Sequence, residues 1–260
     1  QGRAIINLIG CQTEDKVRAF VSVKEFKENQ YIVMCTKNGL IKRSRLSLYS
    51  KPRKGGIYAI DINPGDELIQ SKITEGEQDI ILLDIRMPND FEKKHVINSI
   101  NIGKTPNSFA NWVGALIPFD KKIIIICHKG EHYEVISRLA RIGYENIHGF
   151  FSDIHNLDES YIENLESISA SDILSEKFLK SKFLDVRNIP ELSIGMVEGG
   201  VNIPLKDLNK RLTELDPKKE YIVYCAGGYR SMMAASILKK NNFTKVINIK
   251  GGFNELLKFI

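Results

Sequence analysis

Near the end of the chain stands the sequence Tyr221-Ile222-Val223-Tyr224-Cys225-Ala226-Gly227-Gly228-Tyr229-Arg230-Ser231. Its first four residues form the apolar run typical of a buried strand, and the stretch from Met232 to Lys240 is typical of a helix. The residues between them predict a tight loop, because adjacent glycines let the backbone curl sharply. A strand, a tight loop and a helix therefore follow one another, with a cysteine at the start of the loop.

This loop is a candidate site for an anion and for a reactive thiol. The first turn of a helix cannot satisfy its own N–H groups, so they are free to hold an anion beside the cysteine. The pKa of a free cysteine is about 8.5, but at a helix N-terminus beside an arginine it falls to roughly 3.5 to 7.5. Because the thiolate is the nucleophile, the predicted catalytic residues are Cys225 and Arg230. The predicted substrate-binding residues are Ala226, Gly227, Gly228, Tyr229 and Ser231.

The spacing Cys-x4-Arg with a following serine resembles the active-site loop of rhodanese sulfurtransferases. The resemblance implies that the loop amides hold a persulfide, which the cysteine takes from a donor and passes to an acceptor. Dual-specificity phosphatases and arsenate reductases have a related Cys-x5-Arg loop, whose extra residue makes room for a phosphate-sized oxyanion. The shorter loop here favours sulfur transfer. The other alternative is a buried structural cysteine beside a glycine turn, since free cysteine is among the most buried residue types.

Two α/β repeats fill most of the chain. Buried strands are predicted at Ile80 to Arg86 and Lys121 to Cys127 and a helix at Tyr133 to Ile142, and a second repeat follows from about Ala170. The repeats align at four places, which are Asp84-Ile85-Arg86 with Asp185-Val186-Arg187, Ile100-Asn101-Ile102 with Val201-Asn202-Ile203, Cys127 with Cys225, and Gly130 with Gly228. Offsets of 98 to 101 residues indicate an internal duplication. We therefore predict the α/β class, with tandem rhodanese-like three-layer domains and parallel sheets at residues 79–152 and 170–260, joined by a linker at 152–169.

The loop of the first repeat departs from this pattern. It reads Cys127-His128-Lys129-Gly130-Glu131-His132-Tyr133, so a histidine replaces the arginine and Glu131 adds a negative charge. Both changes raise the pKa of the thiol and weaken anion binding, which predicts a structural or regulatory domain. Sulfur relay through Cys127 is the alternative. His128 and His132 have a spacing that suits a metal, but no further ligands accompany them, so neither a metal nor a cofactor is expected.

Within the rhodaneses, residues 80–260 resemble the tandem pair of bacterial proteins that also carry a metallo-β-lactamase-like persulfide dioxygenase domain. The resemblance rests on the stretches from Phe109 to Pro118, from Arg138 to Tyr144 and from Cys225 to Ser231. The His-x-His-x-Asp-His metal signature of the dioxygenase is absent from the chain, so the resemblance implies a persulfide dioxygenase as a separate partner. At the end of the predicted strand of the second repeat, Asp185 and Arg187 are predicted to form a supporting ion pair.

Residues 1–78 are predicted to be all-β, with short strands at Ala4 to Ile9, Val17 to Val23, Tyr31 to Thr36, Leu40 to Arg43, Ile57 to Ile60 and Leu68 to Ile73. Lys37-Asn38-Gly39 is a hairpin signal. The stretches Gly2 to Leu8, Tyr31 to Arg43 and Gly65 to Ile69 resemble one blade of the C-terminal β-pinwheel in the A proteins of DNA gyrase and topoisomerase IV. That resemblance implies contacts to DNA phosphates from Lys42, Arg43, Arg45, Lys51, Arg53 and Lys54, but a lone blade should bind weakly. A solvated basic face without such a function is the alternative.

Charge and composition narrow the remaining classes. Residues 1–60 hold 12 Lys and Arg against 4 Asp and Glu, leaving 25 against 28 for the rest, so the basic character belongs to the first segment. Four widely spaced cysteines indicate reduced thiols, not a disulfide framework. No apolar run is long enough to span a bilayer and no signal-peptide pattern is present, which predicts a cytoplasmic protein without membrane contact.

Two functions of different classes follow. The leading hypothesis is a sulfurtransferase that moves sulfane sulfur from thiosulfate or a small-molecule persulfide to a thiol or cyanide acceptor, through a persulfide on Cys225. The alternative is a DNA-binding fragment of the A protein of a type IIA topoisomerase, in which residues 1–60 bind DNA weakly and the rhodanese units are passengers. A joined chain with no evolved joint function is a third possibility.

Overall fold

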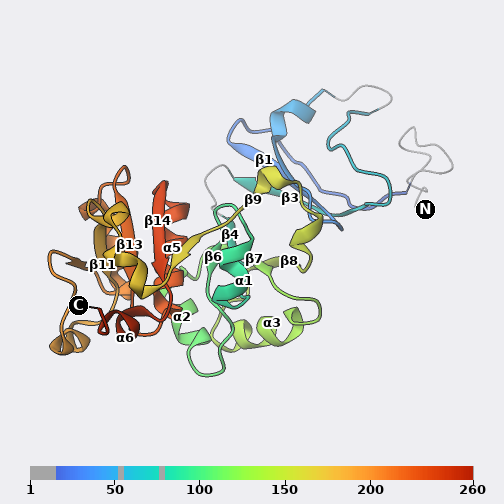
Figure 1. Ribbon diagram of the computed structural model, residues 1–260. Coiled ribbons are helices and arrows are strands. Elements are labelled where there is room, and N and C mark those ends of the chain that lie inside the picture. The colour runs from blue at the N-terminus through green and yellow to red at the C-terminus, as the bar shows by residue number, and fades with distance from the viewer. Residues whose placement is uncertain (1–15, 52–55, 76–79, 260) are drawn as a thin grey trace, which may run out of the picture. The chain divides into compact units, whose positions relative to one another are not determined.

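The computed structural model describes residues 16–51, 56–75 and 80–259 (Figure 1). The chain divides into two compact units. The first consists of Gln1–Asp79 with His155–Leu157, and the second of Ile80–Ile154 with Asp158–Ile260. The second unit contains both α/β repeats.

The first unit is built on a three-stranded antiparallel sheet in the order β2-β1-β3. The strands are β1 (Gln30–Thr36), β2 (Ile41–Arg45) and β3 (Leu68–Glu75), and a 3₁₀ helix, η2 (Leu46–Tyr49), follows β2. The predicted hairpin is confirmed, because β1 and β2 pair across a turn in which Gly39 has φ 88°. The strands predicted at Val17 to Val23 and Ile57 to Ile60 are wrong, and the one at Ala4 to Ile9 lies outside the described residues.

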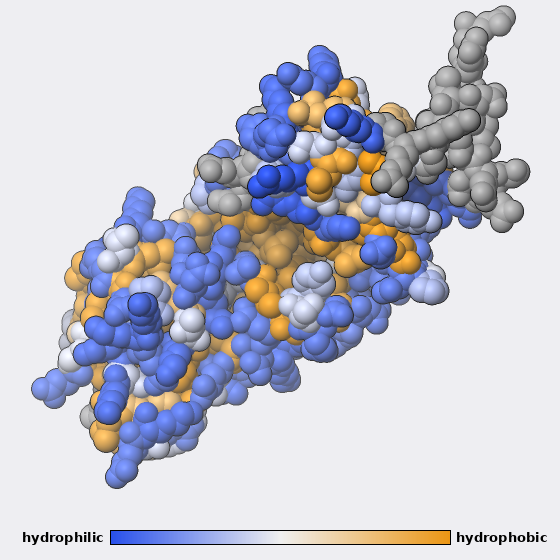
Figure 2. All heavy atoms as spheres, turned by 90° about the horizontal axis from the view of Figure 1, so that it is seen from above, coloured by the Kyte–Doolittle hydropathy of each residue, from blue (hydrophilic) through white to orange (hydrophobic). Residues whose placement is uncertain are grey.

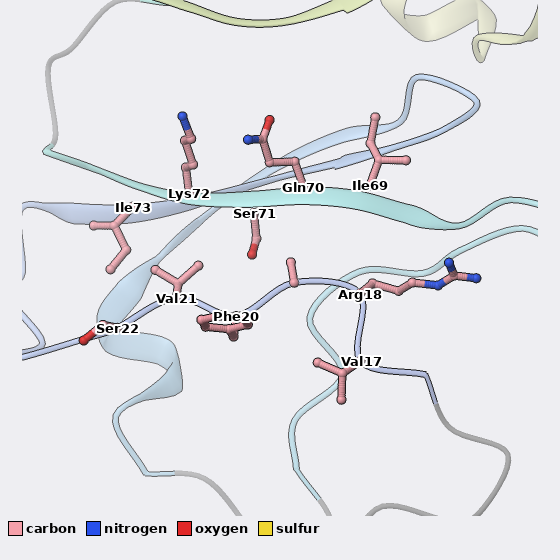
Figure 3. Close-up of a pocket in the computed structure, with 11 residues that line it drawn as sticks. Val17, Arg18, Phe20, Val21, Ser22, Ile69, Gln70, Ser71, Lys72 and Ile73 are labelled. Carbon is pink, nitrogen blue, oxygen red and sulfur yellow. The ribbon is translucent and has the colours of Figure 1, made fainter. Parts of the chain in front are cut away.

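The segment from Val17 to Ser22 fails to pair as a strand although it lies beside β3. Between them is a groove of about 580 Å³, toward which Ser71 and Ile73 point from β3 while Lys72 points away (Figure 3). Among the described residues of this unit, the buried hydrophobic side chains are Met34 and Leu46. Apolar periodicity alone therefore does not make a strand here, because the described residues of this unit form too small a core to cover it.

The first repeat contains a four-stranded parallel sheet in the order β6-β4-β7-β8. Its elements are β4 (Ile80–Asp84), α1 (Pro88–Lys93), β6 (Ile100–Asn101), α2 (Phe109–Leu116), β7 (Lys122–Ile126), α3 (His132–Arg141) and β8 (Ile147–Phe151). The predicted strands and the predicted helix are all present. The two central strands, β4 and β7, are buried at Leu83 and Ile125 but only partly buried at Leu82 and Ile124, so one face of this sheet is better covered than the other.

The second repeat contains a five-stranded parallel sheet in the order β10-β14-β13-β11-β12. Its strands and α-helices are β10 (Glu166–Ile168), β11 (Lys182–Asp185), β12 (Val201–Asn202), α4 (Leu208–Arg211), β13 (Glu220–Tyr224), α5 (Tyr229–Lys240), β14 (Lys245–Ile249) and α6 (Gly252–Leu256). The 3₁₀ helices of the second unit include η4 (Glu159–Tyr161), η5 (Ala170–Leu174), η6 (Glu176–Phe178), η7 (Ile189–Ile194), η8 (Leu205–Asp207) and η9 (Leu212–Glu214). The stretch predicted as a linker supplies β10 to this sheet, and β9 (Ile162–Glu163) pairs antiparallel with β5 (His95–Val96).

The sheet of the second repeat is covered on both faces. Alternate residues of β13 enter different core clusters, with Val223 packed in the cluster that contains α5 and Tyr224 in the cluster that contains Phe253 of α6. This alternation explains why the strand reads as a continuous apolar run. The cluster around α5 continues into the first repeat through Leu83 and Val113, so the two repeats share one core.

Helix α5 also makes polar contacts with the first repeat along its length. The N–H of Asn101 in β6 donates to Oγ of Ser236 at 3.0 Å, and at the helix C-terminal end Lys239 pairs with Glu163 of β9 at 2.8 Å. The helix that follows the candidate loop is therefore packed between the two repeats.

The surface of the described residues is mixed in character. Hydrophilic side chains cover most of the visible face, with smaller apolar areas between them (Figure 2). None of the helices among the described residues is both long and apolar enough to cross a membrane.

Candidate active site

The candidate loop connects β13 to α5 in the second repeat. Cys225 follows the last residue of β13, and Gly228 stands at the N-cap of α5 with φ 94°, a left-handed conformation that glycine adopts without strain. The thiol of Cys225 is only 1% exposed, and its Sγ accepts a hydrogen bond from the N–H of Gly228 at 3.1 Å. A loop amide thus already faces the sulfur, as the sequence predicts for an anion cradle.

The opposite side of the loop is held by helix α6. The N–H of Phe253 donates to the carbonyl of Cys225 at 2.6 Å, and the N–H of Asn254 donates to the carbonyl of Ala226 at 3.1 Å. Because these carbonyls point to α6, the loop can present its amides on the other side. Gly252 makes this contact possible, since a Cβ there would lie 2.3 Å from the carbonyl oxygen of Cys225.

Ser231 connects the thiol to a buried amide. Sγ of Cys225 donates to Oγ of Ser231 at 3.6 Å, and that hydroxyl lies 2.7 Å from Oδ1 of Asn248 in β14 and 3.0 Å from the carbonyl of Gly228. Nδ2 of Asn248 in turn donates to Oγ of Ser167 at 3.3 Å. Asn248 is 3% exposed and was not among the predicted site residues, because nothing in the sequence near it indicates contact with the loop.

Arg230 lies close to Cys225 but is paired with a carboxylate. Its Nη1 and Nη2 donate to the two carboxylate oxygens of Glu191, each at 2.6 Å. The pKa of Arg230 is raised, mainly by these hydrogen bonds. The same hydrogen bonds lower the pKa of Glu191 to about 2. Glu191 was also missed from the sequence, since it stands 39 residues before its partner.

The remaining predicted residues of the loop face different surroundings. The hydroxyl of Tyr229 donates to the carbonyl of Gly103 in the first repeat at 2.6 Å, so the phenol contacts that repeat, not the thiol. A Cβ on Gly227 would meet nothing within 4 Å, which leaves open space beside the loop at that residue.

Asp185 and Arg187 form the predicted ion pair beside the loop. Nη2 of Arg187 lies 2.6 Å from Oδ2 of Asp185, both side chains are at most 1% exposed, and the guanidinium stacks 3.7 Å over the ring of Phe253. Asp84 and Arg86 form the same pair in the first repeat. In each repeat an asparagine 17 residues beyond the aspartate donates to the carbonyls of both members of the pair, so the duplication extends to side-chain geometry.

The loop of the first repeat contains its own negative charge. Glu131 stands at the N-cap of α3, and its carboxylate accepts the N–H of His128, a loop amide, at 3.1 Å. Burial raises the pKa of Cys127 to about 11, with the charges of Glu131 and Asp84 adding to the effect. His132, at the position of the arginine, stacks on Phe150 with ring centroids 3.6 Å apart. This loop therefore has neither an arginine at the position of Arg230 nor a readily ionised thiol.

Cys127 should resist alkylation under native conditions. With a pKa of about 11, roughly one molecule in ten thousand carries the thiolate at pH 7. The thiolate fraction rises with pH and becomes large only as the pH approaches 11, because the raised pKa favours the protonated form. Iodoacetamide labelling at pH 7 followed by peptide mapping should leave Cys127 unmodified. Urea-unfolded protein is the control in which this cysteine labels fully, and equal labelling of the native protein would contradict the prediction.

The predicted basic residues of the first unit lie on or after β2. Lys42, Arg43 and Arg45 are exposed, but side chains alternate along a strand, so only Arg43 and Arg45 share a face. The guanidinium of Arg43 lies 3.8 Å over the ring of Tyr31 on β1. Lys51 is exposed beyond η2, and Arg53 and Lys54 lie outside the described residues.

Each repeat has a cysteine loop between a parallel strand and a helix. The loop at Cys225 keeps the arginine and the loop at Cys127 does not, so the fold defines a duplicated α/β protein with one candidate thiol site. The family model for the Rhodanese-like domain matches residues 66–163 and 169–258. The chain therefore belongs to the rhodanese-like family. The first match begins ahead of β4 and includes β3, although β3 pairs with β1 of the first unit.

Individual relatives match separate parts of the chain. A rhodanese-related protein of Thermoplasma volcanium is 31% identical with a TM-score of 0.34, covering 36% of this chain and 91% of that one. An NAD-dependent persulfide reductase from A. fulgidus is 36% identical with a TM-score of 0.29, covering 34% of this chain and 15% of that one. The DNA gyrase A protein of Clostridium acetobutylicum is 41% identical over 83 residues, which is 32% of this chain and 10% of the relative. The chain thus spans about a tenth of the length of the curated relatives it matches.

Proposed function

We propose that the protein is a sulfurtransferase in which Cys225 carries the sulfur as a persulfide. The observation that carries this proposal is the loop amide of Gly228 directed at Sγ of Cys225 at 3.1 Å, with the loop carbonyls bound by α6 on the other side. A persulfide anion needs its negative charge stabilised. An amide cradle does this by hydrogen bonds from backbone N–H groups, so the sulfur need not be protonated. Membership of the rhodanese-like family supports the same chemistry.

The proposed cycle has two displacements. The thiolate of Cys225 attacks the outer sulfur of the donor, a sulfur–sulfur bond to Cys225 forms, and the donor bond breaks with its electron pair leaving on sulfite or on a thiolate. A thiol or cyanide acceptor then attacks the outer sulfur of the persulfide and releases the Cys225 thiolate. No net oxidation occurs in either step.

Thiosulfate and small-molecule persulfides are the proposed donors, and thiols or cyanide the proposed acceptors. The resemblance that the sequence of residues 80–260 bears to the tandem rhodanese domains of persulfide dioxygenase proteins makes a persulfide dioxygenase the proposed partner, which would consume a persulfide product.

Intact mass spectrometry tests the proposal. The purified, reduced protein is incubated with thiosulfate or glutathione persulfide, and the modified peptide is mapped. We expect a gain of one sulfur atom on the peptide that contains Cys225, and loss of this sulfur on addition of cyanide. No gain with either donor, while Cys225 is reduced, would overturn the proposal.

A second candidate function is DNA binding by the first unit. It is favoured by the similarity to the DNA gyrase A protein together with the shared face of Arg43 and Arg45 on β2. Contacts of this kind would be made to phosphates, so they would be independent of sequence and sensitive to salt.

Fluorescence anisotropy with a labelled DNA duplex tests the second candidate. The logarithm of the DNA affinity falls with the logarithm of the salt concentration. The double variant Arg43→Ala/Arg45→Ala should make this slope less steep by about 2, because two phosphate contacts are lost. The matched control is Lys180→Ala/Lys218→Ala, which removes two exposed cations from the second unit. Equal effects of the two double variants, or no binding at low salt, would reject this function.

A further inference from the structure

The cation beside Cys225 is not available to a substrate as a free charge. Both terminal nitrogens of Arg230 donate to one carboxylate, that of Glu191, at 2.6 Å each. The side chains are 16% and 32% exposed, so this two-pronged pair is partly removed from water. In such a geometry the carboxylate matches the guanidinium fork and competes with any other anion for it.

Glu191 is held in place by its own surroundings as well as by Arg230. It belongs to η7, and its Oε2 accepts the N–H of Asn188, the N-cap of that helix, at 2.9 Å. Asn188 directly follows Arg187 of the buried ion pair, so the backbone that carries Glu191 starts from a fixed point. The carboxylate is therefore a built part of the site.

The pair changes what kind of anion the loop accepts. A guanidinium and a carboxylate together carry no net charge, so attraction for a donor comes mainly from the loop amides. Thiosulfate brings two negative charges and departs as the sulfite dianion, whereas a persulfide carries at most one charge on the transferred sulfur and departs as a thiolate. Repulsion by the carboxylate grows with the charge of the donor and of its leaving group.

We infer that Glu191 is a specificity-determining residue, acting through Arg230, that disfavours dianionic sulfur donors and selects hydropersulfides. The inference rests on the proposed function and narrows its donor class. The balanced step is attack of the Cys225 thiolate on the outer sulfur of R–S–SH, giving R–S⁻ and a Cys225 persulfide, which then loses its proton to become the anion that the loop amides hold. The sulfur–sulfur bond that breaks leaves its electron pair on the donor thiolate, and no oxidant or reductant is needed.

The test measures second-order rate constants for sulfur loading on Cys225 by mass spectrometry, with thiosulfate and with the persulfide of 2-mercaptoethanol, which carries no charge outside its persulfide group. Glu191→Gln keeps the size of the side chain and an oxygen that can accept the N–H of Asn188, but removes the charge. It should raise the ratio of the thiosulfate constant to the persulfide constant about tenfold. Glu191→Asp keeps the charge and should retain the ratio of the parent protein.

The matched control is Glu214→Gln. Glu214 and Arg211 form a similar two-pronged pair, at 2.6 and 2.7 Å, elsewhere in the same repeat. This variant should leave the ratio unchanged. A ratio that stays constant in Glu191→Gln, or an equal fall with both donors, would overturn the inference while leaving the proposed function intact. Absence of loading in the parent protein with either donor would instead overturn the proposed function and the inference together.

Discussion

Replacing Cys225 by serine should slow sulfur transfer by roughly 1,000-fold or more and abolish the gain of sulfur mass on its peptide. Serine keeps the shape of the side chain, and its hydroxyl can accept the N–H of Gly228 that Sγ accepts at 3.1 Å. The loop should therefore fold, but a neutral hydroxyl is a poor nucleophile and forms no persulfide. The measurement is the rate of thiocyanate formation from glutathione persulfide and cyanide, with intact mass as a second readout.

Cys127→Ser is the matched control for this experiment. Cys127 occupies the corresponding position of the first repeat, with a pKa raised to about 11 by burial. Its replacement should leave the rate within about twofold of the parent protein, because a protonated thiol contributes no nucleophile. A comparable loss of transfer rate in Cys127→Ser would support sulfur relay through Cys127. Sulfur transfer by Cys225→Ser at the parent rate would contradict the proposed mechanism.

The parts of the fold that the sequence predicts correctly are those whose pattern is local. The apolar runs that become β4, β7 and β13 are buried strands, and the loop ahead of α5 has its predicted glycine in a left-handed conformation. The duplication is also readable, since each copy preserves the aspartate, arginine and asparagine that bond to one another. Each strand and loop signal lies within one short stretch, and the duplication is found by comparing such stretches at an offset of 98 to 101 residues.

The residues that complete the candidate site are distant in sequence and have no such signal. Glu191, Asn248 and Gly252 reach the loop from η7, β14 and the N-terminus of α6. Their positions follow from the strand order of the sheet, in which β14 and β11 flank β13 on either side. Only the folded sheet brings a glutamate, an asparagine and a glycine of three separate segments to one loop.

In the first unit the sequence predicts a strand that the structure does not contain. Its segment from Val17 to Val23 alternates like a strand, yet it does not pair as one beside β3. Phe20 is 86% exposed there and Tyr58 is 96% exposed, so apolar side chains that would normally drive pairing find little to pack against. Strand propensity depends on such packing, which sequence periodicity cannot report.

Gly252→Ala should strongly destabilise the protein, although a glycine has no side chain to lose. Gly252 has φ +58°, and an added Cβ would lie 2.3 Å from the carbonyl oxygen of Cys225 and 2.7 Å from that of Ala226. Both neighbours are backbone atoms of the candidate loop, so relief requires α6 or the loop itself to move. The cost of the clash and the left-handed backbone together is roughly 3 kcal/mol. For a chain of this size that lowers the thermal midpoint by roughly 8 °C.

The variant Gly130→Ala separates the two causes of the lost stability, which are the clash with the loop carbonyls and the left-handed backbone. Gly130 also has a positive φ, +87°, but a Cβ there would meet nothing within 4 Å. It should therefore lose only the part due to backbone strain, about 1 kcal/mol. Circular dichroism melting gives the two midpoints, and sulfur loading on Cys225 gives the functional readout.

Gly252→Ala should load at least about tenfold more slowly even where it is folded, because displaced carbonyls turn the loop amides away from the sulfur. Equal midpoints and equal loading in the two variants would mean that α6 does not hold the loop, and that the amide cradle is maintained by the loop alone.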